Sequence, residues 1–174
     1  MIGWYIAKIK CRLGGGKEEL NKFLRKQGMT IGAGTKTASP LKTSEPYLVS
    51  IGKNVTISHD VDLITHDNSV CKLFGVGHDL FGRVIIGDNC FLGAHSVIMY
   101  GVTIADNVIV AAGSVVTKSI EESHTIVAGN PARIIGKWDT FREKNVAFEL
   151  CTWKMSKEEK RKYILDNENR LIKR

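Results

Sequence analysis

Aliphatic side chains recur at every sixth position through much of this chain. From residue 86 the sequence reads IGDNCF, LGAHSV, IMYGVT, IADNVI, VAAGSV and VTKSIE, and from residue 51 it reads IGKNVT, ISHDVD and LITHDN. The first residues of these blocks are Ile51, Ile57, Leu63, Ile86, Leu92, Ile98, Ile104, Val110 and Val116. A helix would space apolar residues three and four apart, so this period indicates short strands.

A second set of small or β-branched residues precedes the aliphatic positions by two. Its members are Val49, Val55, Val61, Cys90, Ser96, Val102, Val108 and Ser114. Residues two apart share a face of a strand, so both members of a pair such as Val102 and Ile104 should point inward.

Each block of six therefore predicts one short strand and one corner. The corners contain GKN at 52–54, GDN at 87–89 and ADN at 105–107, and Gly and Asn tolerate the positive φ that a sharp bend demands. Three corners close a triangle of about 18 residues, and triangles stacked about 4.8 Å apart form a parallel β-helix with an aliphatic interior. Geometry alone leaves the handedness open.

One long segment interrupts the period. Residues 69–85 delay the next aliphatic by 17 positions, which predicts a loop extruded directly after His66. Loops of this length are uncommon in compact domains unless they are functional or disordered.

The two ends of the chain show helical patterns. KEELNKFLRKQG places Leu20, Phe23 and Leu24 on one face and ends at Gly28. Near the C-terminus, Ser156 is a candidate N-cap, with Glu159 as its capping-box partner. We therefore expect three parts, a helical segment at 1–30, a β-helix domain at 31–137 and a helical segment at 138–174.

Composition narrows the class of protein. With 174 residues, 43% apolar and 25% charged, the chain is typical of one globular domain with appendages. No apolar run approaches the roughly 18 residues of a membrane span, so we expect a cytoplasmic protein with at most peripheral membrane contact. The net charge is +7, but the basic residues are not interleaved with aromatic ones, which disfavours nucleic-acid binding. Four scattered cysteines form neither a zinc motif nor a disulfide scaffold.

Several motifs together resemble a known family. THDNSV, the extruded loop, IGDNCFLGAHSVIMYGVTIADNVIVAAGSVVTKSI and VAGNPARIIGKW are similar, in order and interval, to the hexapeptide-repeat acyltransferases. The similarity covers residues 31–138 and points to the branch of maltose and galactoside O-acetyltransferases; SEPYLVSIG with ITHD is most similar to bacterial polysaccharide O-acetyltransferases. This resemblance implies a left-handed β-helix, a homotrimer with active sites between subunits, and acetyl-CoA as co-substrate.

The resemblance also implies roles for individual residues. His66 corresponds to a general base, which removes the proton of an acceptor hydroxyl as that hydroxyl attacks the thioester. The backbone N–H of Ala94 corresponds to the oxyanion donor. Glu45, Asp67 and His95 are expected on the acceptor side, although Glu45 could instead orient His66 or be a surface acid. The cofactor-binding residues implied are Gly93, Ala94, Ala112, Thr117, Lys118, Asn130, Pro131 and Arg133.

The resemblance favours O-acetylation of a sugar hydroxyl in surface-polysaccharide biosynthesis, and several other functions compete with it. N-acetylation of an amino sugar, or acetylation of a small saccharide or antibiotic, uses the same machinery. A γ-class carbonic anhydrase needs three histidines on zinc, two of them about five apart, and His59, His66, His78, His95 and His124 include no such pair. We therefore expect no metal site. A non-catalytic scaffold needs only the aliphatic ladder and leaves the other motifs unexplained.

Overall fold

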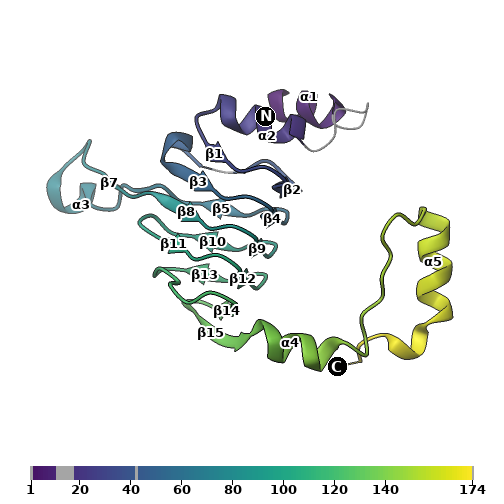
Figure 1. The fold of residues 1–174 in the computed structure, drawn as a ribbon. Helices are drawn as coiled ribbons and strands as arrows, with labels where there is room; N and C mark the ends of the chain where they lie inside the picture. The colour runs from purple at the N-terminus through teal and green to yellow at the C-terminus, as the bar shows by residue number, and fades with distance from the viewer. Residues whose placement is uncertain (1, 11–17, 42, 174) are drawn as a thin grey trace. The chain divides into compact units, whose positions relative to one another are not determined.

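The structure is a computed structural model, and it describes residues 2–10, 18–41 and 43–173. The chain forms two compact units. The first unit is Met1–Gly136 and the second is Lys137–Arg174 (Figure 1). No helix in the described ranges is long and apolar enough to cross a membrane.

Three sheets of very short strands form the body of the first unit. Sheet 1 has the order β1 (Thr30–Ile31), β3 (Val49–Ile51), β8 (Val84–Ile86) and β11 (Thr103–Ile104). Sheet 2 has the order β15 (Ala132–Lys137), β14 (Thr125–Gly129), β12 (Ile109–Val110), β9 (Phe91–Leu92), β4 (Thr56–Ile57) and β2 (Lys36–Thr37). Sheet 3 has the order β13 (Val115–Val116), β10 (Val97–Ile98) and β5 (Asp62–Leu63).

The chain visits the three sheets in turn and so winds into a coil. It runs through β8, β9 and β10 and then through β11, β12 and β13, and the pairs between these two turns are parallel. Partners such as Ile85 and Thr103 lie 18 residues apart, as the repeat of six predicted for a three-sided coil. We name its edges by the sheets they join: edge 1–2, edge 2–3 and edge 3–1.

The interior of the coil contains the residues that the periodicity selects. All nine aliphatics at the sixth positions are at most 2% exposed, and their partners two positions earlier are at most 3% exposed. Full burial of one such aliphatic side chain stabilises the fold by about 1.5–3 kcal/mol. Burial also raises the pKa of the Cys90 thiol, so this cysteine stays protonated in the core.

The corners have the predicted backbone conformation. At edge 1–2, Asn54, Asn89 and Asn107 have φ of 59°, 55° and 59°. Carboxylates join successive turns there: the Asp88 Oδ1 accepts a hydrogen bond from the Lys53 N–H at 2.7 Å, and the Asp106 Oδ1 accepts one from the Asp88 N–H at 2.7 Å.

The extruded loop is a hairpin rather than an irregular excursion. Its base is β6 (His66–Asp67) paired antiparallel with β7 (Leu80–Phe81), and α3 (Cys71–Phe74) lies between them. The expected range of 69–85 ends too late, because Val84 is 0% exposed and already belongs to β8. Val84 is the inward partner two positions before Ile86, so the strand begins there.

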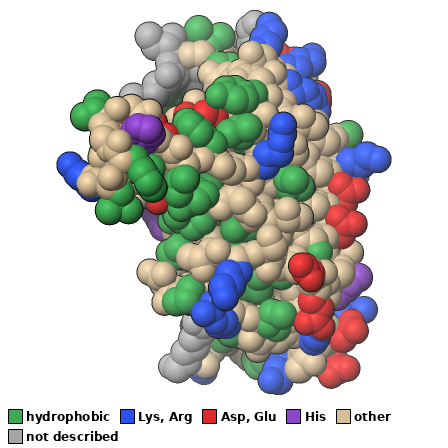
Figure 2. Space-filling model, turned by 90° about the vertical axis from the view of Figure 1, so that its left-hand side faces the viewer, with side chains coloured by type: hydrophobic (Ala, Val, Ile, Leu, Met, Phe, Trp, Pro, Cys, Tyr) green, Lys and Arg blue, Asp and Glu red, His purple; other side chains and the backbone are tan. Residues whose placement is uncertain are grey.

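The hairpin loop exposes large apolar side chains. Leu73 is 80% exposed, Phe74 is 66% exposed and Val76 is fully exposed. Figure 2 views the coil from the side on which the loop projects in Figure 1, and hydrophobic side chains gather on that face.

Two helices precede the coil, where the sequence predicted one. Helix α2 (Glu18–Lys26) buries Leu20 and Leu24 as expected, and Gly28 has a φ of 102° just beyond its end. The additional helix is α1 (Ile2–Lys10), which packs against α2 where Gly3 meets the Phe23 ring. Its sequence spaces Ile2, Tyr5, Ile6 and Ile9 three and four apart, a helical period that the prediction of a single helix overlooked.

The second unit contains α4 (Trp138–Asn145), α5 (Lys157–Asp166) and the 3-10 turn η3 (Glu168–Arg170). The predicted capping box at the start of α5 is confirmed. The Glu159 N–H donates to the Ser156 Oγ at 3.1 Å, and the Ser156 N–H donates to the Glu159 Oε2 at 2.7 Å. The latter hydrogen bond lowers the pKa of Glu159.

Candidate active site

His66 and Glu45 meet at edge 3–1 of the coil. His66 lies in β6, directly after the chain leaves sheet 3, and Glu45 precedes the 3-10 turn η2 (Pro46–Leu48) that leads into β3 of sheet 1. The His66 Nδ1 lies 3.0 Å from the Glu45 Oε2. The two side chains are 33% and 16% exposed, so the pair is partly shielded and still accessible to a substrate.

Thr65 also donates a hydrogen bond to the Glu45 carboxylate. This residue is 1% exposed, and its hydroxyl donates to the Glu45 Oε2 at 2.5 Å. The Thr65 oxygen in turn accepts from the Glu45 N–H at 3.3 Å and lies 3.1 Å from the Thr43 hydroxyl. Because the Thr65 proton is directed to Glu45, Thr43 is the donor of that last bond.

These contacts set the charge of Glu45 and the tautomer of His66. The hydrogen bond from Thr65, followed by that from His66, holds the pKa of Glu45 below its ordinary value. An ionised carboxylate accepts hydrogen bonds only, so the hydrogen-bond network assigns the proton to the His66 Nδ1. The Nε2 of a neutral ring then carries the lone pair.

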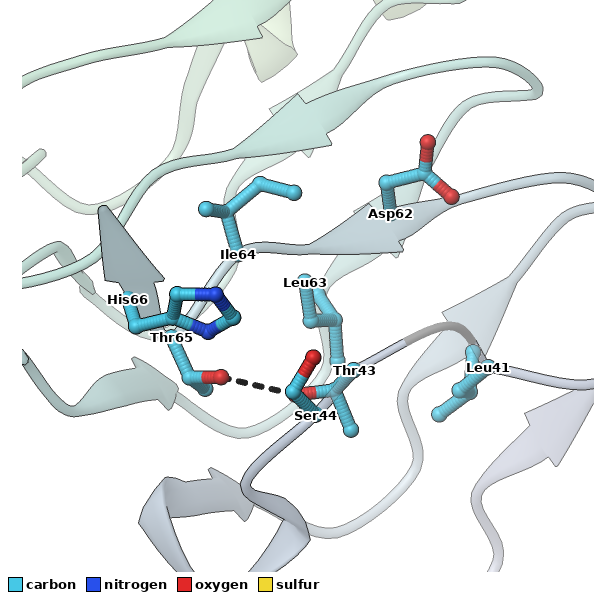
Figure 3. Close-up of a pocket in the computed structure, with 8 residues that line it drawn as sticks. All are labelled: Leu41, Thr43, Ser44, Asp62, Leu63, Ile64, Thr65 and His66. Atoms are coloured by element: carbon cyan, nitrogen blue, oxygen red, sulfur yellow. Dashed lines mark hydrogen bonds between the residues drawn. The ribbon is translucent and has the colours of Figure 1, made fainter. Parts of the chain in front are cut away.

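An open cavity of about 470 Å³ adjoins this pair (Figure 3). Its lining combines hydroxyls, a carboxylate and an imidazole with aliphatic side chains, from Leu41, Thr43, Ser44, Asp62, Leu63, Ile64, Thr65 and His66. Figure 3 shows that the segment of Thr43 and Ser44 faces the β5 segment and its continuation to His66, with the Thr43–Thr65 hydrogen bond between them. The volume falls within the range of small-molecule sites, and the polar groups suit a hydroxylated ligand.

Asp67 anchors the start of the hairpin loop. Its Oδ1 accepts from the Ser69 N–H at 2.8 Å, and its Oδ2 accepts from the Tyr100 hydroxyl at 3.1 Å. Hydrogen bonding from Ser69, and then from Tyr100, lowers the pKa of Asp67, while the carboxylate raises the pKa of Tyr100. Both carboxylate oxygens therefore have a partner in the protein, and an acceptor-binding role for Asp67 stays a prediction.

A second group of predicted residues lies at edge 2–3, between β9 and β10. Gly93 packs directly on the next turn, where a Cβ on it would lie 2.4 Å from the Ala112 nitrogen. The Ala94 carbonyl accepts from the Gly113 N–H at 2.8 Å. No described residue accepts a hydrogen bond from the Ala94 N–H. His95 follows with a φ of 58°.

The remaining predicted residues lie further along the coil. Thr117 and Lys118 are exposed just after β13, at edge 3–1. Asn130 and Pro131 form the turn between β14 and β15, and the Arg133 Nη1 donates to the Ala132 carbonyl at 2.9 Å.

Within one chain, the predicted residues thus fall into separate groups. Glu45, His66 and Asp67 share edge 3–1, whereas Ala94 and His95 share edge 2–3. The proposed base and the proposed oxyanion donor therefore lie on different edges of the same coil.

The sequence did not identify three residues that contact His66, Glu45 or Asp67. Thr65 follows the inward Leu63 by two positions, so the alternation along a strand could have revealed it. The Phe81 ring lies 6.0 Å from the His66 ring, and Tyr100 bonds Asp67 from the next turn of the coil. No local pattern marks Phe81 or Tyr100, because pairing across the hairpin and stacking of the coil bring them to the site.

Comparisons with known proteins agree with this architecture. The family described as hexapeptide repeat of succinyl-transferase matches residues 83–118. Protein CapG of Staphylococcus aureus is 39% identical over 155 residues, which cover 84% of this chain and 89% of CapG. Galactoside O-acetyltransferase of Escherichia coli (strain K12) is 36% identical over 106 residues, 60% of this chain and about half (51%) of that enzyme.

A solved structure supports the same assignment. A galactoside acetyltransferase in complex with coenzyme A is 26% identical, with a TM-score of 0.58 over 80% of this chain and 78% of that one. The six-residue repeat, together with 39% identity to a relative across most of both chains, shows that this chain belongs to the hexapeptide-repeat acyltransferases.

Proposed function

We propose that this chain is an acetyl-CoA-dependent O-acetyltransferase that acts on a sugar hydroxyl, with His66 as the general base. The observation that carries the proposal is the contact between the His66 Nδ1 and the Glu45 carboxylate beside an open polar cavity. The galactoside O-acetyltransferase relative supports a sugar as the acceptor. Residues 31–137 form the acyltransferase domain in this proposal, and the family likeness supports a left-handed coil.

Glu45 and Thr65 prepare His66 for proton abstraction. The carboxylate holds the Nδ1 proton, so the Nε2 lone pair is available to a hydroxyl in the cavity. As the hydroxyl oxygen bonds to the thioester carbon, His66 takes its proton, and the adjacent carboxylate stabilises the imidazolium that results. When the C–S bond breaks, His66 returns this proton to the leaving sulfur. No covalent enzyme intermediate is required.

The corner at Ala94 suits the acyl donor. Acetyl-CoA supplies an activated thioester carbonyl when bound. Ala94 and Ala112 have only methyl side chains, and Gly93 packs against the next turn, so these positions place no long side chain in the path of a narrow pantetheine arm along edge 2–3. The Ala94 N–H, which has no acceptor among the described residues, is available to the developing oxyanion. Lys118 and Arg133 are exposed cations that would attract the phosphates.

Because His66 and Ala94 occupy different edges, the proposal requires two copies of the chain. Edge 3–1 of one subunit would face edge 2–3 of its neighbour, and a cyclic trimer repeats this contact three times. This arrangement also agrees with the homotrimer that the sequence resemblance implies.

The test is turnover of acetyl-CoA with a panel of acceptors, followed as free thiol release. Wild-type protein is expected to use a saccharide hydroxyl, and His66→Ala is expected to lose about 10² to 10⁴ in kcat. Coenzyme A binding, measured by calorimetry, should persist in the variant because His66 is not among the residues proposed to hold coenzyme A. Polysaccharide, small saccharide, amino sugar and antibiotic acceptors in the same panel separate the O- and N-acetylation alternatives.

His124→Ala provides the matched control, because it removes a histidine at edge 1–2 and should keep full activity. Wild-type turnover by His66→Ala would refute His66 as the base. Failure of every acyl-CoA to support turnover in the wild type would refute the transferase assignment itself.

A further inference from the structure

Three metal-ligating side chains gather at edge 2–3, whereas His66 of the same chain lies at edge 3–1. His59 and Asp60 lie in the corner between β4 and β5, and His95 lies in the corresponding corner between β9 and β10. These two corners belong to successive turns of the coil, since Thr56 pairs with Phe91 and Asp62 pairs with Val97.

The backbone holds the two histidines in register. The His95 N–H donates to the His59 carbonyl at 3.1 Å, which fixes one corner over the other. The two rings meet edge to face with centroids 5.4 Å apart. In the sequence, His59 and His95 are separated by a whole turn of the coil and by the hairpin loop. The spacing of histidines along the chain therefore could not pair them.

One potential ligand atom from each of the three residues lies within 4.8 Å of the other two. Bonds of about 2.0–2.2 Å to a tetrahedral metal put its ligand atoms about 3.4 Å apart. All three side chains are exposed, so modest rotations about their side-chain bonds can close this gap while the backbone stays in place.

The donor set selects a class of ion. Two imidazole nitrogens and one carboxylate oxygen suit borderline divalent transition metals, whereas Mg²⁺ and Ca²⁺ prefer oxygen ligands alone. We propose that His59, Asp60 and His95 form a site for a divalent transition-metal ion such as Zn²⁺, with at least one coordination position open to solvent. Binding of the ion does not require the proposed acetyl transfer, although His95 directly follows Ala94 of the proposed donor corner.

Calorimetric titration of the tag-free full chain with ZnCl₂ tests the site. We expect one Zn²⁺ per chain, with affinity reduced about tenfold or more in His59→Gln and in His95→Asn. Asparagine is chosen at 95 because the left-handed φ there suits it, as Asn54, Asn89 and Asn107 show. Circular dichroism and thermal unfolding confirm that each variant is folded.

Two further variants separate this site from other histidines. His66→Ala and His124→Asn should bind Zn²⁺ like the wild type, because neither histidine belongs to the group of three ligands. The inference is overturned if wild-type protein does not bind Zn²⁺, or if the double variant His59→Gln/His95→Asn binds it as tightly as the wild type. Loss of binding in His66→Ala with retention in the double variant would likewise overturn it, by moving the ion to the Glu45–His66 pair.

Discussion

Replacing Glu45 with glutamine tests whether the carboxylate positions His66 or binds the acceptor. The change keeps the shape of the side chain and an oxygen that can accept from the His66 Nδ1 at about the same place. It removes the negative charge that faces the ring at 3.0 Å. We expect lower turnover, because the imidazolium formed during proton transfer loses its counter-charge.

The magnitude follows from the kind of bond that is lost. A hydrogen bond to a charged group contributes about 1.5–3 kcal/mol, compared with about 0.5–1.5 kcal/mol for a neutral one. Glu45 and His66 are only partly exposed, at 16% and 33%, so solvent screens the pair incompletely. The difference, about 1–1.5 kcal/mol in the transition state, corresponds to a decrease in kcat of roughly fivefold to thirteenfold.

Steady-state thiol release with varied acetyl-CoA and varied acceptor measures this effect. We expect kcat to fall in Glu45→Gln while the KM for acetyl-CoA stays the same, because the Glu45 carboxylate contacts His66 and Thr65 and is not among the residues proposed to hold acetyl-CoA. Glu18→Gln is the control, since Glu18 bonds Arg25 on helix α2 and should not affect turnover. Unchanged kcat in Glu45→Gln would refute the positioning role. A higher KM for the acceptor at constant kcat would assign Glu45 to acceptor binding instead.

The remaining predictions concern stability. Leu92→Ala should lower the unfolding free energy by about 2–5 kcal/mol in urea denaturation, since Leu92 is 0% exposed in the interior of the coil. A loss below about 1 kcal/mol would contradict this. The folded-state pKa of Glu45 is depressed, so its stabilisation is present above the unfolded pKa of about 4.3 and is lost as pH falls through the folded value. The difference in unfolding free energy between wild type and Glu45→Gln, measured by urea denaturation, should therefore persist from pH 8 to about 5 and shrink in stronger acid. A difference that vanishes above pH 5 would be inconsistent with this.

The coil could be predicted from the six-residue repeat alone. Each face of each turn must contribute one aliphatic side chain to the narrow interior. Each face takes six residues of the chain, so these aliphatic residues recur every six positions and can be recognised in the sequence. Ile57, Leu92 and Val110 could be assigned to the core for this reason, and the corner asparagines could be assigned to positive φ. His66 stood out because it interrupts that pattern and begins the extruded loop.

Contacts between turns were decided only by the tertiary structure. Glu45 reaches His66 and Thr65 because one turn of the coil stacks on the next, and Tyr100 reaches Asp67 in the same way. The hairpin base, where Phe81 faces His66, depends on an antiparallel pairing that no period of six encodes. A repeating pattern specifies which side chains face inward. The partners of outward side chains depend instead on the length and conformation of each corner and loop, which decide which residues of successive turns lie side by side.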